Sequence, residues 1–360
     1  MTDIPPIPPE RRRGRAAATN RTNRFERFVT EAVDDGWDRQ EALPPLRTEV
    51  REERPRRAVT RNTSPDVGFD RSVNPYRGCE HGCIYCFARP SHAYLGLSPG
   101  LDFETKLIAR PDMPEVLARD LSRPGYRAAV LAIGTNTDPY QPVERDRGIM
   151  RRVLEVLRDF RHPVSVVTKG ALIERDVDIL SEMAAMGLAR VGISVTTLDP
   201  ATARAMEPRV PGPARRLGAI RVLSEAGVPV RVMASPVVPA LTDHELEAIL
   251  AAGAEAGAVA ASSIVLRLPR EVASLFRDWV EEAFPDRAAR IMGRVRELHG
   301  GRDYDPAFGQ RMTGQGEWAR LLRMRFQVAL RRTGLSEEMP ALRCDLFRVP
   351  PRAGDQLSLF

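Results

Sequence analysis

The sequence contains few cysteines, few lysines and no long apolar run. No apolar stretch of the 360 residues approaches the roughly 20 that span a bilayer, so we expect no membrane helix. Met1 to Glu10 is rich in proline and lacks the apolar core of a secretory signal, which predicts a cytoplasmic protein. In that reducing compartment the four cysteines are expected to act as metal ligands or reactive thiols, not as a disulfide framework.

Lysine is nearly absent although the chain is rich in basic residues. Of the 54 Lys and Arg residues, only Lys106 and Lys169 are lysines. A lysine offers a compact point charge and an arginine a planar fork, so the two are not interchangeable, and Lys169 becomes a candidate functional residue. The net charge of +6 permits a polyanionic partner, but 54 basic residues against 48 acidic ones do not identify one.

Alternating strand and helix patterns predict an α/β fold. Amphipathic helical stretches separate five short β-rich runs, and we place a sixth strand just before Cys79. The five runs are 129–133, 164–168, 191–195, 230–234 and 264–268. Six parallel units are too few for a complete eight-fold barrel. We therefore expect an open, partial (β/α)6 barrel with its chemistry at the carboxyl ends of the strands.

Composition divides the chain into four segments. Residues 1–62 mix proline, arginine and acidic residues and predict a mostly disordered arm. Residues 63–270 hold the predicted partial barrel, and residues 271–347 are expected to form a helical cap. Residues 348–360 predict an extended linker followed by a short tail.

Three of the four cysteines lie within eight residues. Cys79, Cys83 and Cys86 form a C-x3-C-x2-C pattern, in which Gly78 and Gly82 allow the backbone to wrap closely around a bulky ligand. Three thiols cannot pair off as disulfides. They also leave one position of a cubane iron-sulfur cluster without a protein ligand, and open metal positions are where substrates usually react.

This spacing, with the aromatic Tyr85 before the last cysteine, resembles the signature of the radical S-adenosylmethionine (radical SAM) superfamily. The resemblance implies a 4Fe-4S cluster on the three thiols, with Tyr85 beside the cofactors. It also implies that S-adenosylmethionine binds the open iron and is cleaved, with an electron from an external donor, to a 5'-deoxyadenosyl radical. The alternative is a zinc site in which His81 or His92 supplies a fourth ligand.

Polar residues follow the next strands. Asn136 and Asp138 lie in the segment 134–144, which resembles superfamily segments that contact the amino group of S-adenosylmethionine. Lys169 and Ser194 match positions at which spore photoproduct lyase and its relatives hold the carboxylate of that cofactor. The simpler interpretations are a polar turn that caps a helix for 134–144 and a structural salt bridge for Lys169.

The resemblance covers roughly residues 74–268 and fits an uncharacterised branch related to spore photoproduct lyase. The segments 206–209 and 233–239 also match that branch. Spore photoproduct lyase carries a further cysteine at the end of the second strand, which donates hydrogen to the product radical. This chain has no cysteine in the corresponding segment 132–135. Cys344 lies far downstream and is expected to be a buried structural thiol.

The last five residues resemble the pentapeptide by which bacterial repair and replication proteins dock on the DNA sliding clamp. After the linker, apolar anchors and a hydrogen-bonding glutamine would enter preformed pockets of the clamp. The five residues are Gln356, Leu357, Ser358, Leu359 and Phe360. The alternative is a C-terminus that folds back onto its own core.

Three functions remain open from the sequence. The leading one is a radical enzyme that acts on DNA, for repair or modification of a base that must be flipped into the barrel mouth. The second keeps the cluster and S-adenosylmethionine but has a protein or a small molecule as substrate. The third is a non-catalytic adaptor that is held together by zinc and recruits partners through its arm and tail.

Overall fold

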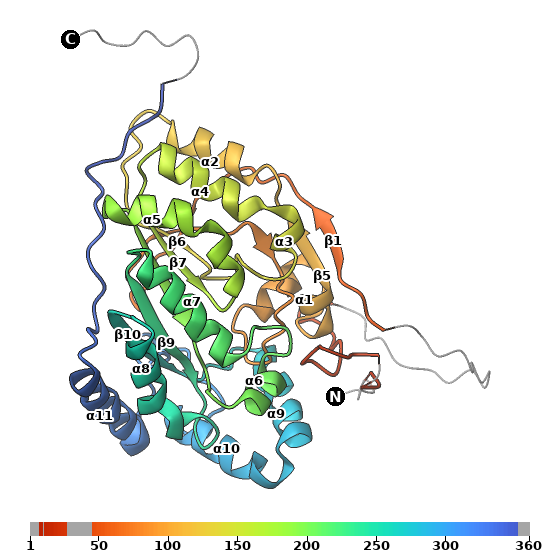
Figure 1. Cartoon of the computed structure of the whole chain (residues 1–360). Coiled ribbons are helices and arrows are strands. Elements are labelled where there is room, and N and C mark those ends of the chain that lie inside the picture. The colour runs from red at the N-terminus through yellow and green to blue at the C-terminus, as the bar shows by residue number, and fades with distance from the viewer. Residues whose placement is uncertain (1–6, 10, 27–44, 352–360) are drawn as a thin grey trace.

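A seven-stranded sheet forms the centre of the molecule (Figure 1). The computed structural model describes residues 7–9, 11–26 and 45–351. The strands, in the order in which they pair, are β10 (Ala260–Val265), β9 (Val230–Val237), β8 (Ala189–Ser194), β7 (Val164–Thr168), β6 (Leu131–Ile133), β3 (Arg71–Val73) and β2 (Thr60–Arg61). All neighbours are parallel except β2, which runs antiparallel to β3 at the edge.

The six parallel strands lie side by side in chain order. This arrangement confirms the predicted partial (β/α)6 barrel, including a first strand ahead of Cys79. The strands form because their apolar side chains are removed from water on the faces of the sheet: Val164 and Val166 of β7 are fully buried, as are Val230 and Val232 of β9. The carboxyl ends of all six strands therefore meet at one end of the barrel.

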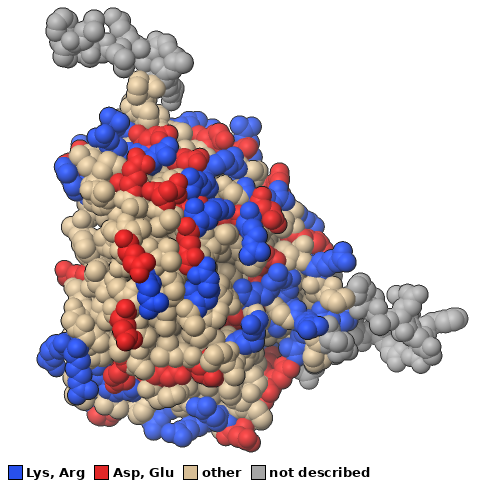
Figure 2. Space-filling view, viewed as in Figure 1, with Lys and Arg blue, Asp and Glu red and all other residues tan. Residues whose placement is uncertain are grey.

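Helices connect the strands and cover the outer face of the sheet (Figure 1). The longer helices bury an apolar stripe, as α4 does with Val153, Leu154 and Leu157. The connecting helices are α2 (Met113–Leu121), α3 (Glu144–Arg147), α4 (Ile149–Asp159), η2 (Ala171–Asp176), α5 (Val177–Ala185), α6 (Pro200–Met206), α7 (Pro213–Glu225), η3 (Asp243–Glu245) and α8 (Leu246–Glu255). Acidic and basic side chains are interspersed over much of the surface that Figure 2 shows.

A second, three-stranded sheet stands beside the first strand of the barrel. Its order is β1 (Glu49–Glu52), β5 (Lys106–Ala109) and β4 (Tyr76–Arg77), and the short helices η1 (Arg89–Leu95) and α1 (Leu101–Thr105) precede β5.

The described parts of the N-terminal segment pack against this sheet, so the disorder expected for residues 1–62 does not extend to residues 7–9, 11–26 and 45–62. The backbone amides of Ala16 and Ala17 donate to the carboxylate of the buried Glu104, at 3.1 and 3.0 Å. β1 then pairs in parallel with β5. This mostly polar segment is ordered because its backbone groups form hydrogen bonds with the rest of the chain. The composition of the segment does not reveal these bonds.

Three helices follow the last strand, as predicted, although they end before residue 347. α9 (Glu271–Ala283) and α10 (Pro285–Leu298) share an apolar cluster with Ile84 and Tyr85 of the cysteine segment. α11 (Gly316–Thr333) packs against α8. Residues 336–351, which we call the C-terminal strap, contain no further helix in the described chain.

The C-terminal strap crosses the end of the barrel at which the strands begin. The amide of Ser336 donates to the carbonyl of Val259 just before β10, and the amide of Arg343 donates to Gly187 just before β8. The amide of Arg348 donates to Phe160 just before β7. The C-terminal strap therefore lies at the end of the barrel opposite the carboxyl ends of the strands.

The C-terminal strap also covers a buried histidine. Phe347 contacts the ring of His162 edge-on at a centroid distance of 5.5 Å, and the hydroxyl of Tyr126 lies 2.9 Å from His162 Nε2. Nδ1 of His162 lies 3.0 Å from the carbonyl of Pro163, which accepts only if Nδ1 carries the proton. Burial lowers the pKa of His162 from 6.5 to about 4, so this histidine is neutral in the folded protein at neutral pH.

We expect this burial to make stability dependent on pH. Because the folded pKa is below the unfolded one, the unfolded chain binds more protons between pH 6.5 and about 4, and the stabilisation present above pH 6.5 is lost as the pH falls. The full loss corresponds to roughly 3 kcal/mol at 1.36 kcal/mol per pH unit. Urea denaturation at several pH values should show a smaller pH dependence in His162→Asn than in the wild type, and no such difference in the exposed His244→Asn.

Two sequence expectations concern segments at the limits of the structure. No helix in the described parts of the chain has both the length and the apolar character needed to cross a membrane. The tail of Gln356, Leu357, Ser358, Leu359 and Phe360 lies outside the described residues, so its binding to a sliding clamp stays a prediction.

Candidate functional site

A cavity of about 210 Å³ opens at the carboxyl ends of the strands, beside the cysteine segment. The segment follows β4 and ends at η1. The other walls come from the segment after β6 and from residues within or just after β7, β8, β9 and β10. All eight residues that the sequence predicted for the cluster and its cofactor line this cavity. They are Cys79, Cys83, Tyr85, Cys86, Asn136, Asp138, Lys169 and Ser194.

The three thiols lie in surroundings that disfavour a free thiolate. Cys79 and Cys83 are buried and Cys86 is half-buried. Burial, the largest cause, raises the pKa of all three thiols, and the carboxylate of Asp138 raises that of Cys79 further. Thiols with raised pKa values are poor nucleophiles by themselves and become thiolates when a metal binds. This chemistry suits metal ligands better than catalytic nucleophiles.

A buried arginine that was not predicted from the sequence, Arg89, holds the cysteine segment by hydrogen bonds to its backbone. Arg89 is fully buried, and its guanidinium donates five hydrogen bonds. It binds the carbonyls of Cys83 and Gly82, each at 3.0 Å, and its ion pair with the buried Glu104 is 2.6 Å long. Because Glu104 also accepts from the N-terminal segment, this pair ties the arm to the cysteine segment.

A buried glutamine fixes the first cysteine from the other side. The side-chain oxygen of Gln141 accepts from the amide of Glu80 at 2.8 Å, and its amide nitrogen donates to the carbonyl of Gly78 at 3.2 Å. Gly78 has φ +76°, and a Cβ there would lie 2.8 Å from a methyl carbon of Leu107. The predicted need for a glycine before Cys79 is thereby explained by a tight, left-handed turn against β5.

Asp138 lines the cavity, and its carboxylate also forms hydrogen bonds with neighbouring residues of the chain. Its carboxylate accepts from the amide of Lys169 at 2.8 Å and from the hydroxyl of Thr168 at 2.5 Å, and it lies 3.3 Å from Nδ1 of His81. Burial acts to raise the pKa of Asp138, but His81 and the hydrogen bonds outweigh it and lower the pKa to about 2. Asp138 is therefore charged, and it positions the backbone that carries Lys169. Asn136 is only half-buried on the same wall.

Lys169 and Ser194, predicted from two different strand ends, meet in the cavity. Nζ of Lys169 donates to the hydroxyl of Ser194 at 2.8 Å, and that hydroxyl donates to the carbonyl of Ser235 at 2.7 Å. Nζ also lies 5.8 Å from the ring centre of Tyr85. In the described chain Lys169 forms no ion pair with a carboxylate, so the structural salt bridge considered from the sequence is not among its contacts. Its ammonium group is directed at the cavity instead.

A second buried charge pair lies behind Tyr85. The Tyr85 hydroxyl donates to Glu207, and the guanidinium of Arg216 forms a 2.8 Å ion pair with the same carboxylate. Burial acts to raise the pKa of Glu207, but Arg216 and Lys169 outweigh it and lower the pKa. Arg216 also donates to the carbonyl of Ser194 at 3.0 Å. The segment 206–209, which the sequence picked out by resemblance, thus contributes a charged support for the cavity wall.

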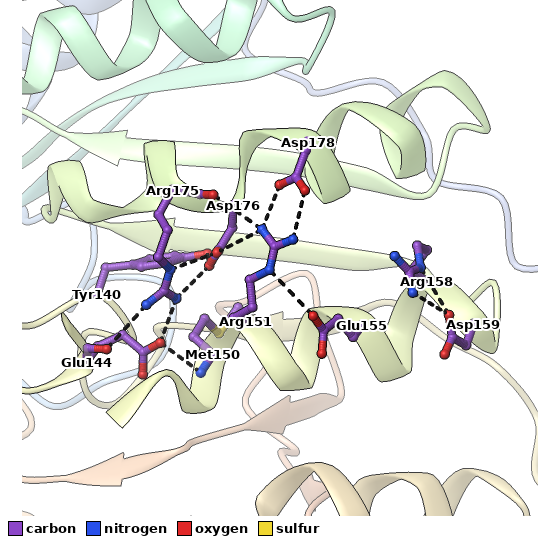
Figure 3. A network of polar contacts seen from close by, with 10 residues as sticks. All are labelled: Tyr140, Glu144, Met150, Arg151, Glu155, Arg158, Asp159, Arg175, Asp176 and Asp178. Atoms are coloured by element: carbon purple, nitrogen blue, oxygen red, sulfur yellow. Dashed lines mark hydrogen bonds and ion pairs between the residues drawn. The ribbon is translucent and has the colours of Figure 1, made fainter. Parts of the chain in front are cut away.

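A network of charges anchors the loop after β6 (Figure 3). Arg175 pairs with Glu144 at 2.7 Å and with Asp176 at 2.8 Å, and the hydroxyl of Tyr140 donates to Asp176 at 3.0 Å. Glu144 also accepts from the amide of Met150 at the start of α4. The loop that carries Asn136 and Asp138 is therefore held at its far end by buried ion pairs rather than left mobile on the surface.

Comparison with known proteins identifies this arrangement. The family model of the Radical SAM superfamily matches residues 73–252, which is half of the 360-residue chain. The chain belongs to the radical SAM superfamily. Membership implies S-adenosylmethionine and a 4Fe-4S cluster as cofactors, and it makes the protein an enzyme.

Two relatives found by sequence are named as uncharacterized proteins. An uncharacterized protein of Mycobacterium tuberculosis is 38% identical over 233 residues, which cover 64% of this chain and 67% of that protein. An uncharacterized protein of Methanocaldococcus jannaschii is 25% identical over 173 residues, 48% of this chain and 62% of that protein. Among solved structures, spore photoproduct lyase matches with a TM-score of 0.57 at 14% identity, over 79% of each chain. This similarity shows a shared fold.

The residues around the three thiols fit a radical SAM cluster. The thiols line one cavity, no disulfide joins any of the four cysteines, and the segment turns tightly at two glycines. A Cβ on Gly82, which has φ +66°, would lie 2.8 Å from the carboxylate of Glu104. Cys79, Cys83 and Cys86 would hold the cluster, and Lys169 and Ser194 would face the cofactor at the same cavity.

Of the two histidines proposed for a zinc site, His81 lines the cavity and His92 does not, and each has a polar neighbour of its own. Nδ1 of His81 faces Asp138, and Nε2 of His92 lies 2.9 Å from the carbonyl of Lys106. His92 packs edge-on against Phe103 and does not line the cavity. In the part of the chain that the structure describes, no three His, Cys, Asp or Glu side chains are placed to hold a single metal ion. The contacts of the two histidines therefore do not support a mononuclear zinc centre.

We expect Lys169→Ala to keep the iron content of the superfamily's cluster but to weaken S-adenosylmethionine binding ten- to hundredfold. Loss of a charge-assisted contact to the cofactor's carboxylate costs about 1.5 to 3 kcal/mol. Equilibrium dialysis of the anaerobically reconstituted protein measures this. Lys106→Ala is the matched control, because Lys106 pairs with Asp102 at 3.0 Å outside the cavity. Equal affinity in both variants would show that Lys169 is structural.

Proposed function

We propose that this protein is a radical SAM enzyme that holds a 4Fe-4S cluster on Cys79, Cys83 and Cys86 and acts on DNA. When bound and reduced, the cluster and S-adenosylmethionine supply a 5'-deoxyadenosyl radical. The observation that carries the proposal is the convergence of three thiols, two of them buried and one half-buried, with Lys169 and Ser194 on one cavity at the carboxyl ends of the strands.

The walls of the cavity suit an aromatic base. Apolar side chains from three strand ends line it, among them Val167, Met233 and Ile264. At its rim Phe87 is 46% exposed, and the guanidinium of Arg267 lies 4.9 Å from the Phe87 ring centre. An exposed aromatic ring stacked on arginine is a surface on which nucleic-acid bases stack. A base flipped from the strand could pass this pair and enter the apolar cavity.

A structure with the same fold holds a ligand made of two nucleosides. One of the matching structures is a spore photoproduct lyase variant with bound AdoMet and dinucleoside spore photoproduct. That likeness concerns the fold, so the substrate of this chain is proposed from the cavity and its rim.

A hydrogen atom returned to the product radical must come from another donor than the cysteine used by spore photoproduct lyase. No cysteine occupies the segment 132–135, and the only cysteines lining the cavity in the described chain are the three cluster candidates. Cys344, expected to be buried, is exposed on the C-terminal strap next to the start of β8. It lies at the end of the barrel away from the cavity, which argues against Cys344 as the hydrogen donor.

The test is anaerobic turnover. The reconstituted protein is incubated with S-adenosylmethionine and dithionite, alone, with intact DNA and with irradiated DNA, and 5'-deoxyadenosine and altered nucleosides are measured. We expect DNA to stimulate 5'-deoxyadenosine formation and a modified nucleoside to appear. Cys83→Ala should form neither product. Formation of 5'-deoxyadenosine that no DNA stimulates, but that a protein or small molecule does, would overturn the DNA substrate and favour the alternative enzyme.

A further inference from the structure

A second cleft lies beside the cavity and is lined by five arginines. It has a volume of about 510 Å³ and shares His81 with the cavity. The arginines come from α3, η2, α6, the segment after α6, and α7. They are Arg145, Arg175, Arg204, Arg209 and Arg215. Glu174 is the only acidic residue in the lining.

This local excess of positive charge contrasts with the whole chain, in which 54 basic residues nearly balance 48 acidic ones. Figure 2 shows basic side chains gathered over the region between α3 and α6, on the face where acidic and basic groups are otherwise interspersed. The elements that form the cleft follow β6, β7 and β8, so the cleft opens at the same end of the barrel as the cavity.

Some of these arginines have internal partners and some do not. Arg175 is neutralised by Glu144 and Asp176 (Figure 3), and Arg215 pairs with Glu174. In contrast, neither Arg145 nor Arg204 forms an ion pair in the part of the chain that the structure describes.

Arg145 and Arg204 are both exposed. Among the residues that the structure describes, Arg204 donates to the carbonyl of Pro208 alone, at 3.4 Å. Arg209, at the edge shared with the cysteine segment, lies 3.3 Å from Glu80. The cleft therefore presents guanidinium groups of Arg145 and Arg204 that no carboxylate of the described chain neutralises.

We propose that this cleft, which we call the arginine cleft, binds the backbone phosphates of a DNA strand whose base occupies the neighbouring cavity. The proposal rests on the proposed function and says where the backbone of the substrate strand binds. Guanidinium groups form charge-assisted, bidentate hydrogen bonds with phosphate. A flipped nucleotide needs an apolar site for its base and a cationic site for its flanking phosphates. The cavity and the arginine cleft could supply these two sites, because they meet at His81.

Salt dependence of binding tests the proposal. The anaerobically reconstituted full-length protein is titrated into a fluorescently labelled single-stranded oligonucleotide over a range of sodium chloride concentrations. Each phosphate contact on a single strand contributes about 0.7 to the slope of log affinity against log salt. We expect the double variant Arg145→Gln/Arg204→Gln to lower the magnitude of that slope by about 1.4 and the affinity by roughly tenfold.

The matched control removes two charges elsewhere. Arg320→Gln/Arg323→Gln lies on α11, which contributes nothing to the arginine cleft, and should leave slope and affinity unchanged. The cleft variant should also keep the wild-type rate of 5'-deoxyadenosine formation without DNA, because neither arginine lines the cavity.

The outcomes separate the two proposals. If the wild type binds DNA but the cleft variant has the same affinity and slope, the arginine cleft is overturned and the DNA substrate stands. If the wild type binds DNA through the cleft but DNA stimulates no turnover, the proposed function is overturned and the cleft stands. If an acidic peptide displaces the oligonucleotide as effectively as unlabelled DNA does, the partner is an acidic protein, and the assignment to DNA is overturned.

Discussion

Replacement of any one of Cys79, Cys83 and Cys86 by alanine is expected to abolish the iron-sulfur absorbance of the purified protein and its cleavage of S-adenosylmethionine. Thiolates hold such clusters, and with two protein ligands the cluster would lack the three-point attachment that the cavity offers. Anaerobic preparation, iron and sulfide analysis and visible spectra before and after dithionite provide the measurement. The wild type should be brown and should bleach on reduction.

The fourth cysteine is the internal control. Cys344 is exposed on the C-terminal strap, so Cys344→Ala should retain the iron, the sulfide and the activity of the wild type. A colourless wild-type protein with stoichiometric zinc after anaerobic preparation would contradict the cluster. Loss of iron in the Cys344 variant, equal to that in the other three, would contradict the assignment of ligands.

Arg89→Met is expected to destabilise the protein by about 3 to 5 kcal/mol and to prevent cluster assembly. Loss of one partner from a buried ion pair leaves the other charge uncompensated, here Glu104, which is fully buried. The carbonyls of Gly82 and Cys83, inside the cysteine segment, also lose their donor. Urea denaturation of the protein without iron gives the stability, and iron content after reconstitution gives the effect on the cluster.

Two further variants make this prediction specific. Arg54→Met removes an exposed arginine that pairs with Asp112 at 3.2 Å, and it should cost no more than about 1 kcal/mol. Arg89→Lys should rescue little, because an ammonium group has three donors in place of the five hydrogen bonds that the guanidinium makes. Full iron loading in Arg89→Met would show that the cysteine segment holds its shape without this support.

The strands are predictable from the sequence where apolar residues dominate, and the predicted position of one strand is wrong where they do not. β7 begins and ends where the run 164–168 predicted. The last strand was expected at 264–268 but spans Ala260–Val265. Alanine and serine have a weak preference for strands, so the first four residues of β10 carry no clear signal. Pairing with β9 decides their conformation, and only the tertiary structure supplies it.

In the candidate site too, some residues could be predicted from the sequence and others could not. Lys169 was noticeable because the chain has only two lysines, and the structure places it at the cavity. Arg89 and Arg216 are both buried beside the site, yet in the sequence they are two among many arginines. Burial of a charge depends on long-range partners such as Glu104 and Glu207, and no local pattern records these pairings.

The C-terminal strap places the described C-terminus at the end of the barrel opposite the cavity. The strap passes the starts of β10, β8 and β7 in that order, and the described chain ends at Pro351, three residues beyond its contact with Phe160. The cavity and the arginine cleft open at the other ends of these strands. A tether joined to residues after Pro351 would therefore hold the barrel at the end where its strands begin, opposite the cavity and the arginine cleft. Immobilisation through the C-terminus should leave substrate access unhindered, whereas attachment near the cysteine segment should obstruct it.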